Sequence, residues 1–220
     1  MGATETMAAV RAALLKYPGA APLKTAADAQ KIAAKAARAA GRILTADLPS
    51  IPANERHALV VSVVREINRV ANDAAQQMQR SRAAAYGEQS LGTAQPEVDA
   101  LRADHLATYA DGLYMDGAEV ADPDAALMDV LENNARMCVD DLEEALADAR
   151  YNMGMKSVIV RTATGANSCE WCLSAAGEYE YGPTMDKTMA FGRHNNCDCV
   201  IEYHPAGGKV ETVRNYRRSK

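Results

Sequence analysis

The chain has 220 residues, 48% of them apolar, and a formal net charge of −5. This length is enough for one large domain or two small ones with a hydrophobic core. No run reaches the roughly 18 to 20 apolar residues of a membrane span, and residues 1–16 lack the basic start and apolar stretch of a secretion signal. We therefore expect a soluble, folded chain that neither spans a membrane nor carries a secretion signal.

Alanine contributes heavily to the apolar content, whereas aromatic residues make up only 5% of the chain. Such a composition suits long helices that pack closely. The charge is uneven, because residues 1–90 carry 12 Lys and Arg against 7 Asp and Glu, whereas residues 91–160 carry 4 against 15. An acidic block of this kind is usually a solvated helix face, although it can also guide assembly with a basic partner.

Apolar residues at three- and four-residue intervals predict a series of helices over the first two thirds of the chain. Proline- and glycine-containing stretches such as YPGAAP and DLPSIP interrupt this periodicity and separate the helices. We expect helices at residues 5–16 and 25–46, from Asn54 as N-cap to about 85, from Pro96 through Leu101 and Leu106 to Leu113, and from Leu127 to Tyr151.

The helix that ends near Tyr151 has two kinds of noteworthy side chain. Cys138 lies within its apolar series and is interpreted as a small core residue rather than a metal ligand. Its polar face is predicted to hold the acidic residues Asp140, Asp141, Glu143 and Glu144.

The character of the sequence changes at Gly154, where KSVIVRTATG is the first β-branched run that predicts a strand. We therefore expect a helical domain at residues 1–153, a metal-binding module at 154–206 and a basic tail at 207–220. The predicted fold is mainly α, with an elongated alanine-rich helical region followed by a small α+β module stapled by zinc. Weak contacts to nucleic acid or to a partner are assigned to the tail residues Arg214, Arg217, Arg218 and Lys220.

Four of the five cysteines stand in two clusters, CEWC at residues 169–172 and HNNCDC at residues 194–199. Two cysteines separated by two residues place both sulfurs on one side of a turn, as a tetrahedral zinc site requires. After 21 intervening residues the second cluster offers three more donors for the two remaining places. The preferred ligand set is Cys169, Cys172, His194 and Cys197, with Cys199 as the replacement for His194.

Other interpretations of these clusters are less favourable. Two disulfides or free thiols are the alternatives to a metal, but an odd cysteine count without a secretion signal favours thiolates in a reducing compartment. A catalytic zinc keeps an open coordination position, whereas the donors here equal or exceed the number needed, so a structural zinc is expected. A zinc deaminase is disfavoured because no His-x-Glu occurs and no proline precedes CEWC.

The order of these features resembles the minor head proteins of tailed bacteriophages, in the branch related to the Mu F-type head morphogenesis domain. That family carries a Cys-x-x-Cys, a downstream glycine and a His-x-x-Cys-x-Cys. The family usually has a proline directly after the histidine, where this chain has Asn195. The resemblance covers residues 150–205, and the motif falls on Cys169, Cys172, Gly177, His194, Cys197 and Cys199.

What the resemblance implies is a low-copy structural protein of the phage head without catalytic activity. Its expected partners are capsid or portal subunits, with packaged DNA reached through the basic tail, and it would act on no small-molecule substrate. Its expected location is the virion, and the host cytoplasm during assembly. Two alternatives remain open at this point: a zinc-dependent nucleic-acid-binding regulator, and a zinc hydrolase or nuclease.

Overall fold

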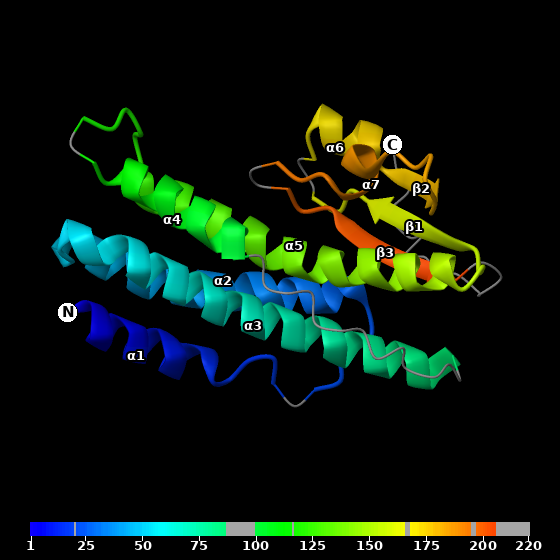
Figure 1. Ribbon diagram of the computed structural model, residues 1–220, viewed down its shortest axis with the longest axis horizontal. Helices are drawn as coiled ribbons and strands as arrows, with labels where there is room; N and C mark the ends of the chain where they lie inside the picture. The colour runs from blue at the N-terminus through cyan, green and yellow to red at the C-terminus, as the bar shows by residue number, and fades with distance from the viewer. Residues whose placement is uncertain (20, 87–99, 116, 166–167, 195–196, 206–220) are drawn as a thin grey trace. The chain divides into compact units, whose positions relative to one another are not determined.

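The computed structural model describes residues 1–19, 21–86, 100–115, 117–165, 168–194 and 197–205. The fold is mainly helical with one small antiparallel sheet near the C-terminus, as predicted (Figure 1). Two compact units are formed, Met1–Leu142 and Glu143–Lys220. The helices are α1 (Ala3–Leu14), α2 (Ala26–Asp47), α3 (Ala53–Tyr86), α4 (Ala100–Leu113), α5 (Pro123–Asn152), α6 (Glu170–Ala175) and α7 (Lys187–Phe191), with a short 3₁₀ turn, η1 (Leu48–Ser50), and the strands are β1 (Ser157–Thr162), β2 (Gly177–Glu180) and β3 (Val200–Pro205).

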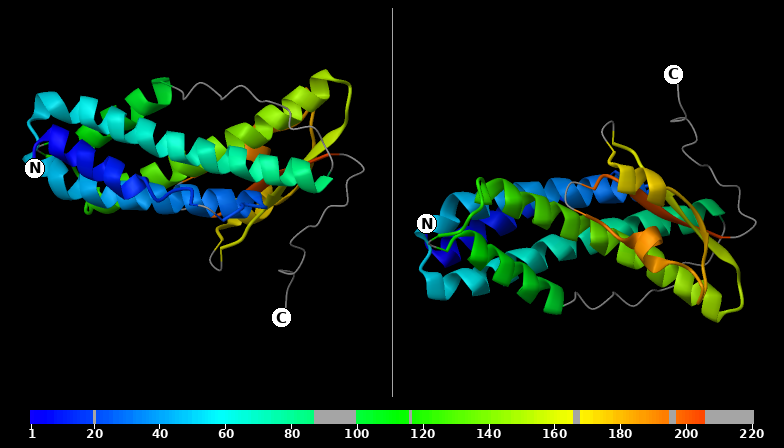
Figure 2. Two further views of the ribbon diagram at one scale, coloured as in Figure 1. Left: turned by 90° about the horizontal axis from the view of Figure 1, so that it is seen from below. Right: turned by 90° about the horizontal axis from the view of Figure 1, so that it is seen from above.

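The first unit is a set of closely packed helices in which α1, α2 and α3 lie side by side (Figure 2). Thr25 caps α2 by accepting from the Asp28 N–H, while the Asp28 carboxylate accepts from the Thr25 N–H. The small side chains of α2 allow close approach: a Cβ on Gly41 would lie 2.5 Å from the Met128 Sδ of α5. The inner face of α2 is made of Ala29, Ala33, Ala36, Ala37 and Ala40, all fully buried.

Two details of the predicted helices were wrong. α3 begins at Ala53, so Asn54 lies inside the helix rather than capping it. Leu101 is 66% exposed, because α4 turns its alanines inward instead and packs through Ala103, Ala107 and Ala110. The expected start of that helix at residue 96 lies outside the described residues.

The predicted polar face of α5 is not uniformly solvated. Asp140 and Glu143 are both buried, and each carboxylate accepts a hydrogen bond from within its own unit. Asp140 accepts from the Gln30 side chain at 2.7 Å, and Glu143 accepts from the Tyr203 N–H of β3. Cys138 lies in the helical core as predicted, and burial raises the pKa of its thiol to about 12.

The second unit contains the last turns of α5 and a three-stranded antiparallel sheet of order β2-β1-β3. Gly154, with a φ of 73°, ends α5 in the left-handed conformation and turns the chain toward β1, which confirms the predicted strand. Alternate residues of β1 share one face, and Ser157, Ile159 and Arg161 are all buried there. The apolar cluster consists of Leu146, Ala147, Ile159, Tyr181, Ala190, Ile201 and Tyr203.

The division between the units falls within α5, since Leu146 and Ala147 belong to the apolar cluster of the sheet. The sequence places its boundary at the helix-to-strand change, after residue 153. The proposed tail contacts Arg214, Arg217, Arg218 and Lys220 lie outside the described residues. Within the described part of the chain, no helix is both long enough and apolar enough to cross a membrane.

Candidate metal centre

The first pair of cysteines stands at the start of α6. Cys169 is the N-cap of this helix, in an extended conformation, and its Sγ accepts from the Cys172 N–H at 3.4 Å. A sulfur in the N-cap position takes over one of the amide donors that every helix leaves unpaired in its first turn. This local geometry brings the Cys172 side chain to the same side as Cys169.

The second group of donors follows α7. Gly192 ends this helix with its N–H donating to the Thr188 carbonyl. A Cβ at Gly192 would clash with that carbonyl oxygen, so the turn fits glycine. The chain then reaches His194, and the Cys197 N–H donates back to the His194 carbonyl at 3.2 Å, which forms a second turn.

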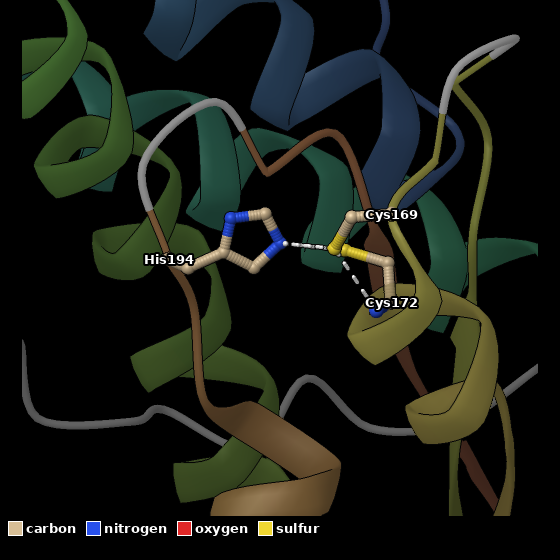
Figure 3. A group of neighbouring side chains, drawn as sticks. All are labelled: Cys169, Cys172 and His194. Carbon is tan, nitrogen blue, oxygen red and sulfur yellow. Dashed lines mark hydrogen bonds between the residues drawn. The ribbon is translucent and has the colours of Figure 1, made fainter.

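All five predicted donors are brought together, and Figure 3 shows three of them, Cys169, Cys172 and His194. The donor atoms of Cys169, Cys172 and His194 lie within 4.8 Å of one another, and so do those of Cys172, Cys197 and Cys199. The His194 Nε2 lies 3.2 Å from the Cys169 Sγ and 2.9 Å from the Cys172 Sγ. Cys172 belongs to both groups and therefore stands at the centre of the cluster.

The spacing of two of these sulfurs fits a tetrahedral metal ion. Zinc–sulfur bonds of about 2.3 Å at tetrahedral angles separate two sulfurs by roughly 3.8 Å. The Cys172 and Cys197 sulfurs are 3.8 Å apart. A sulfur and an imidazole nitrogen on the same ion would be roughly 3.5 Å apart. The Cys197 sulfur does not lie within 4.8 Å of both Cys169 and His194, so the preferred four donors would have to draw closer together to share one ion. The cluster can hold a metal ion.

The sulfurs are not joined in disulfides: all five cysteines are free, and only Cys169 of the clustered four is exposed. A hydrogen bond from the Cys199 thiol lowers the pKa of Cys197 to about 4. The same hydrogen bond, together with burial, raises the pKa of Cys199, and burial raises that of Cys172. Binding of a cation to these sulfurs displaces the remaining protons.

One residue next to the cluster was not predicted from the sequence. Arg161 of β1 is 1% exposed, and its Nη2 lies 3.8 Å from the Cys197 Sγ. The signal was present in the sequence, because a lone arginine stands two residues after Ile159 and so shares the face of the strand that turns inward. Gly177, which belongs to the sequence motif, begins β2 and pairs with Arg161 in the sheet.

Comparisons with known protein families, with curated proteins and with solved structures found no match for this chain.

Proposed function

We propose that the chain is a structural protein in which a zinc ion cross-links two distant segments of the second unit, and that it acts as a minor head protein of a tailed bacteriophage. The ligands would be Cys169, Cys172, His194 and Cys197, with Cys199 as the replacement for His194. The bound ion would supply a cross-link and Lewis acidity, and a structural role needs only the cross-link. No catalytic activity is assigned.

The observation that carries the structural role is the convergence of five soft donors from two segments that are far apart in sequence. Structural zinc sites are closed by four protein ligands and are rich in thiolates, whereas catalytic sites leave a position for water or substrate. Four cysteines and one histidine are enough to close the coordination sphere without water. This surplus of donors favours a structural zinc site, here called the metal clamp, over the catalytic zinc site of a hydrolase or nuclease.

The small apolar cluster of the second unit supports a stabilising role for the metal. Only a few side chains from α5, the sheet, α7 and the segment after β2 form it. A structural zinc site contributes on the order of 10 kcal/mol at neutral pH, which is comparable with the whole stability of a small domain. Metal binding would therefore decide whether this unit is folded.

The phage role rests on the resemblance of the motif from Cys169 to Cys199. Capsid or portal subunits are the proposed partners, and the virion is the proposed location. A metal-clamped unit attached to a helical one is suited to holding a fixed binding surface, which is what an assembly protein needs. Packaged DNA is a further proposed partner of the basic tail.

Two measurements test this proposal. Elemental analysis of the purified chain should find one zinc per molecule, and Cys172→Ser should reduce that content strongly, whereas Cys138→Ser, at a cysteine of the helical core, should leave it unchanged. Mass spectrometry of tailed particles purified from the source of the chain should detect it together with capsid and portal subunits. A chain without bound metal contradicts the clamp, and its absence from such particles contradicts the phage role.

A further inference from the structure

The Arg161 side chain touches every segment that carries a donor of the candidate metal centre. Its Nη1 donates to the Met189 carbonyl at 3.0 Å and to the Gly192 carbonyl at 2.6 Å, on the path from α7 to His194. Its Nη2 faces the Cys197 Sγ. The guanidinium carbon lies over the ring of Trp171, 4.6 Å from its centroid.

Trp171 extends this arrangement to the remaining donors. It stands between Cys169 and Cys172 on α6, so its ring is fixed to the first pair of ligands. The rings of His194 and Trp171 form a T-shaped pair, with centroids 5.5 Å apart and an interplanar angle of 83°. A single buried guanidinium is thus in contact with α6 through Trp171, with the turn before His194 through two carbonyls, and with Cys197 directly.

The charge of Arg161 also matches the needs of the centre. Zn²⁺ with two thiolates is neutral, and each further thiolate adds one negative charge. The preferred set of three cysteines and one histidine therefore has a net charge of −1. A buried charge without a partner is strongly unfavourable. Arg161 is 1% exposed and places a permanent positive charge against a ligand sulfur, and the Arg193 guanidinium lies 3.9 Å from the same sulfur.

Resting on the proposed metal clamp, we infer that Arg161 is a positioning residue of the metal centre: it holds the two ligand segments in register and, together with Arg193, offsets the thiolate charge. Arginine suits both tasks because its planar fork donates to several acceptors at once and stacks on an aromatic face. Lysine in its place would keep the charge but lose the fork and the stacking. Arg161 does not itself bind the ion.

The test uses the full chain loaded with zinc or cobalt and three variants. Arg161→Met removes the charge and Arg161→Lys keeps it. Ile159→Val is a matched control, since Ile159 lies on the same buried face of β1 but belongs to the apolar cluster of the sheet, whereas Cys172, Cys197 and Cys199 form a separate cluster. Zinc affinity is measured by competition with a chromophoric chelator. The number of bound thiolates is followed by the sulfur-to-metal charge-transfer band of the Co²⁺ form.

We expect zinc affinity to fall about 10- to 100-fold in Arg161→Met, the range typical of residues that support metal ligands. The charge-transfer band per bound cobalt should weaken in this variant, because the centre loses one of the two guanidinium charges next to Cys197 and holds its thiolates less firmly. Arg161→Lys should keep the band and lose less affinity. Ile159→Val should keep both the affinity and the band. If Arg161→Met does not fold, the zinc affinities of Arg161→Lys and Ile159→Val are compared instead. A lower affinity in Arg161→Lys supports the inference, and equal affinities overturn it.

The inference is overturned if Arg161→Met binds zinc like the wild type with an unchanged cobalt spectrum. It is also overturned if Ile159→Val loses as much affinity as the arginine variants, since Arg161 would then act only through the sheet. A wild-type chain that binds no zinc is a different result, because it removes the metal clamp and with it this inference. The wild-type titration therefore separates failure of the clamp from failure of the positioning role.

Discussion

Replacing Glu143 with leucine should weaken the attachment of α5 to β3. The Glu143 carboxylate is fully buried and accepts the hydrogen bond of the Tyr203 N–H. A hydrogen bond to a charged group contributes about 1.5–3 kcal/mol, and a buried N–H left without its acceptor loses a similar amount. Both free energies describe the loss of the same hydrogen bond, so they do not add. We therefore expect Glu143→Leu to lower the local stability at Tyr203 by about 1.5–3 kcal/mol.

Native-state hydrogen exchange of the metal-loaded chain measures this loss at the Tyr203 amide, where it corresponds to roughly 10- to 150-fold faster exchange. Glu143→Gln keeps an uncharged acceptor and should fall between the wild type and Glu143→Leu. Glu144→Gln is the matched control, because Glu144 pairs with the exposed Lys187 side chain and such surface ion pairs contribute about 0–1 kcal/mol. Equal protection of Tyr203 in the wild type and in Glu143→Leu would refute the reasoning.

Three further outcomes are expected. The carboxylates of Asp104 and Asp111 raise the pKa of His57. This contact between α3 and α4 therefore contributes its full stability below the ordinary histidine pKa, and that stability is lost as the pH rises through the raised pKa. NMR titration should find that raised pKa, and His57→Gln should remove up to about 1 kcal/mol, at acid pH only. Gly192→Ala should lower the melting temperature of the second unit, because the new Cβ would meet a backbone carbonyl of α7. Gly112→Ala in α4 has open space around the new Cβ and should stabilise the chain by about 0.5–1 kcal/mol. Equal effects of the two substitutions would contradict this. Removal of metal by EDTA should abolish amide protection in the sheet while most far-ultraviolet helical signal remains, because the core of the first unit contains no residue of the candidate metal centre. A complete loss of that signal would contradict this expectation.

The helices, the first strand and the convergence of the cysteine clusters could be predicted from the sequence because each depends on local spacing. The apolar series of α3 has helical periodicity whatever surrounds it. The two-residue separation of Cys169 and Cys172 similarly determines a turn with both sulfurs on one side. Such patterns carry their own geometry, and long-range packing had only to bring the two clusters together.

The errors came from residues whose surroundings are set by distant segments. Asp140 and Glu143 lie on what reads as a solvated face, yet Gln30 and the backbone of β3 cover them. Leu101 reads as a core residue and is exposed, because alanines allow α4 to pack closely along another face. Arg161 was overlooked because a charged residue in a β-branched run is normally assigned to the outer face. Helical and strand periodicity define which residues share a face, but not what that face meets.

These polar groups explain why metal binding and folding of the second unit should be one event. The interior of the unit holds a small apolar cluster together with the buried charges of Glu143 and Arg161 and three buried cysteines. Burial of apolar surface favours collapse of any arrangement of similar composition, whereas charged groups are tolerated only where their partners are in place. Arg161 finds its partners only when the turn after α7 and Cys197 are both positioned. A bound metal ion would fix those same two segments, so binding it and placing Arg161 would select the same structure.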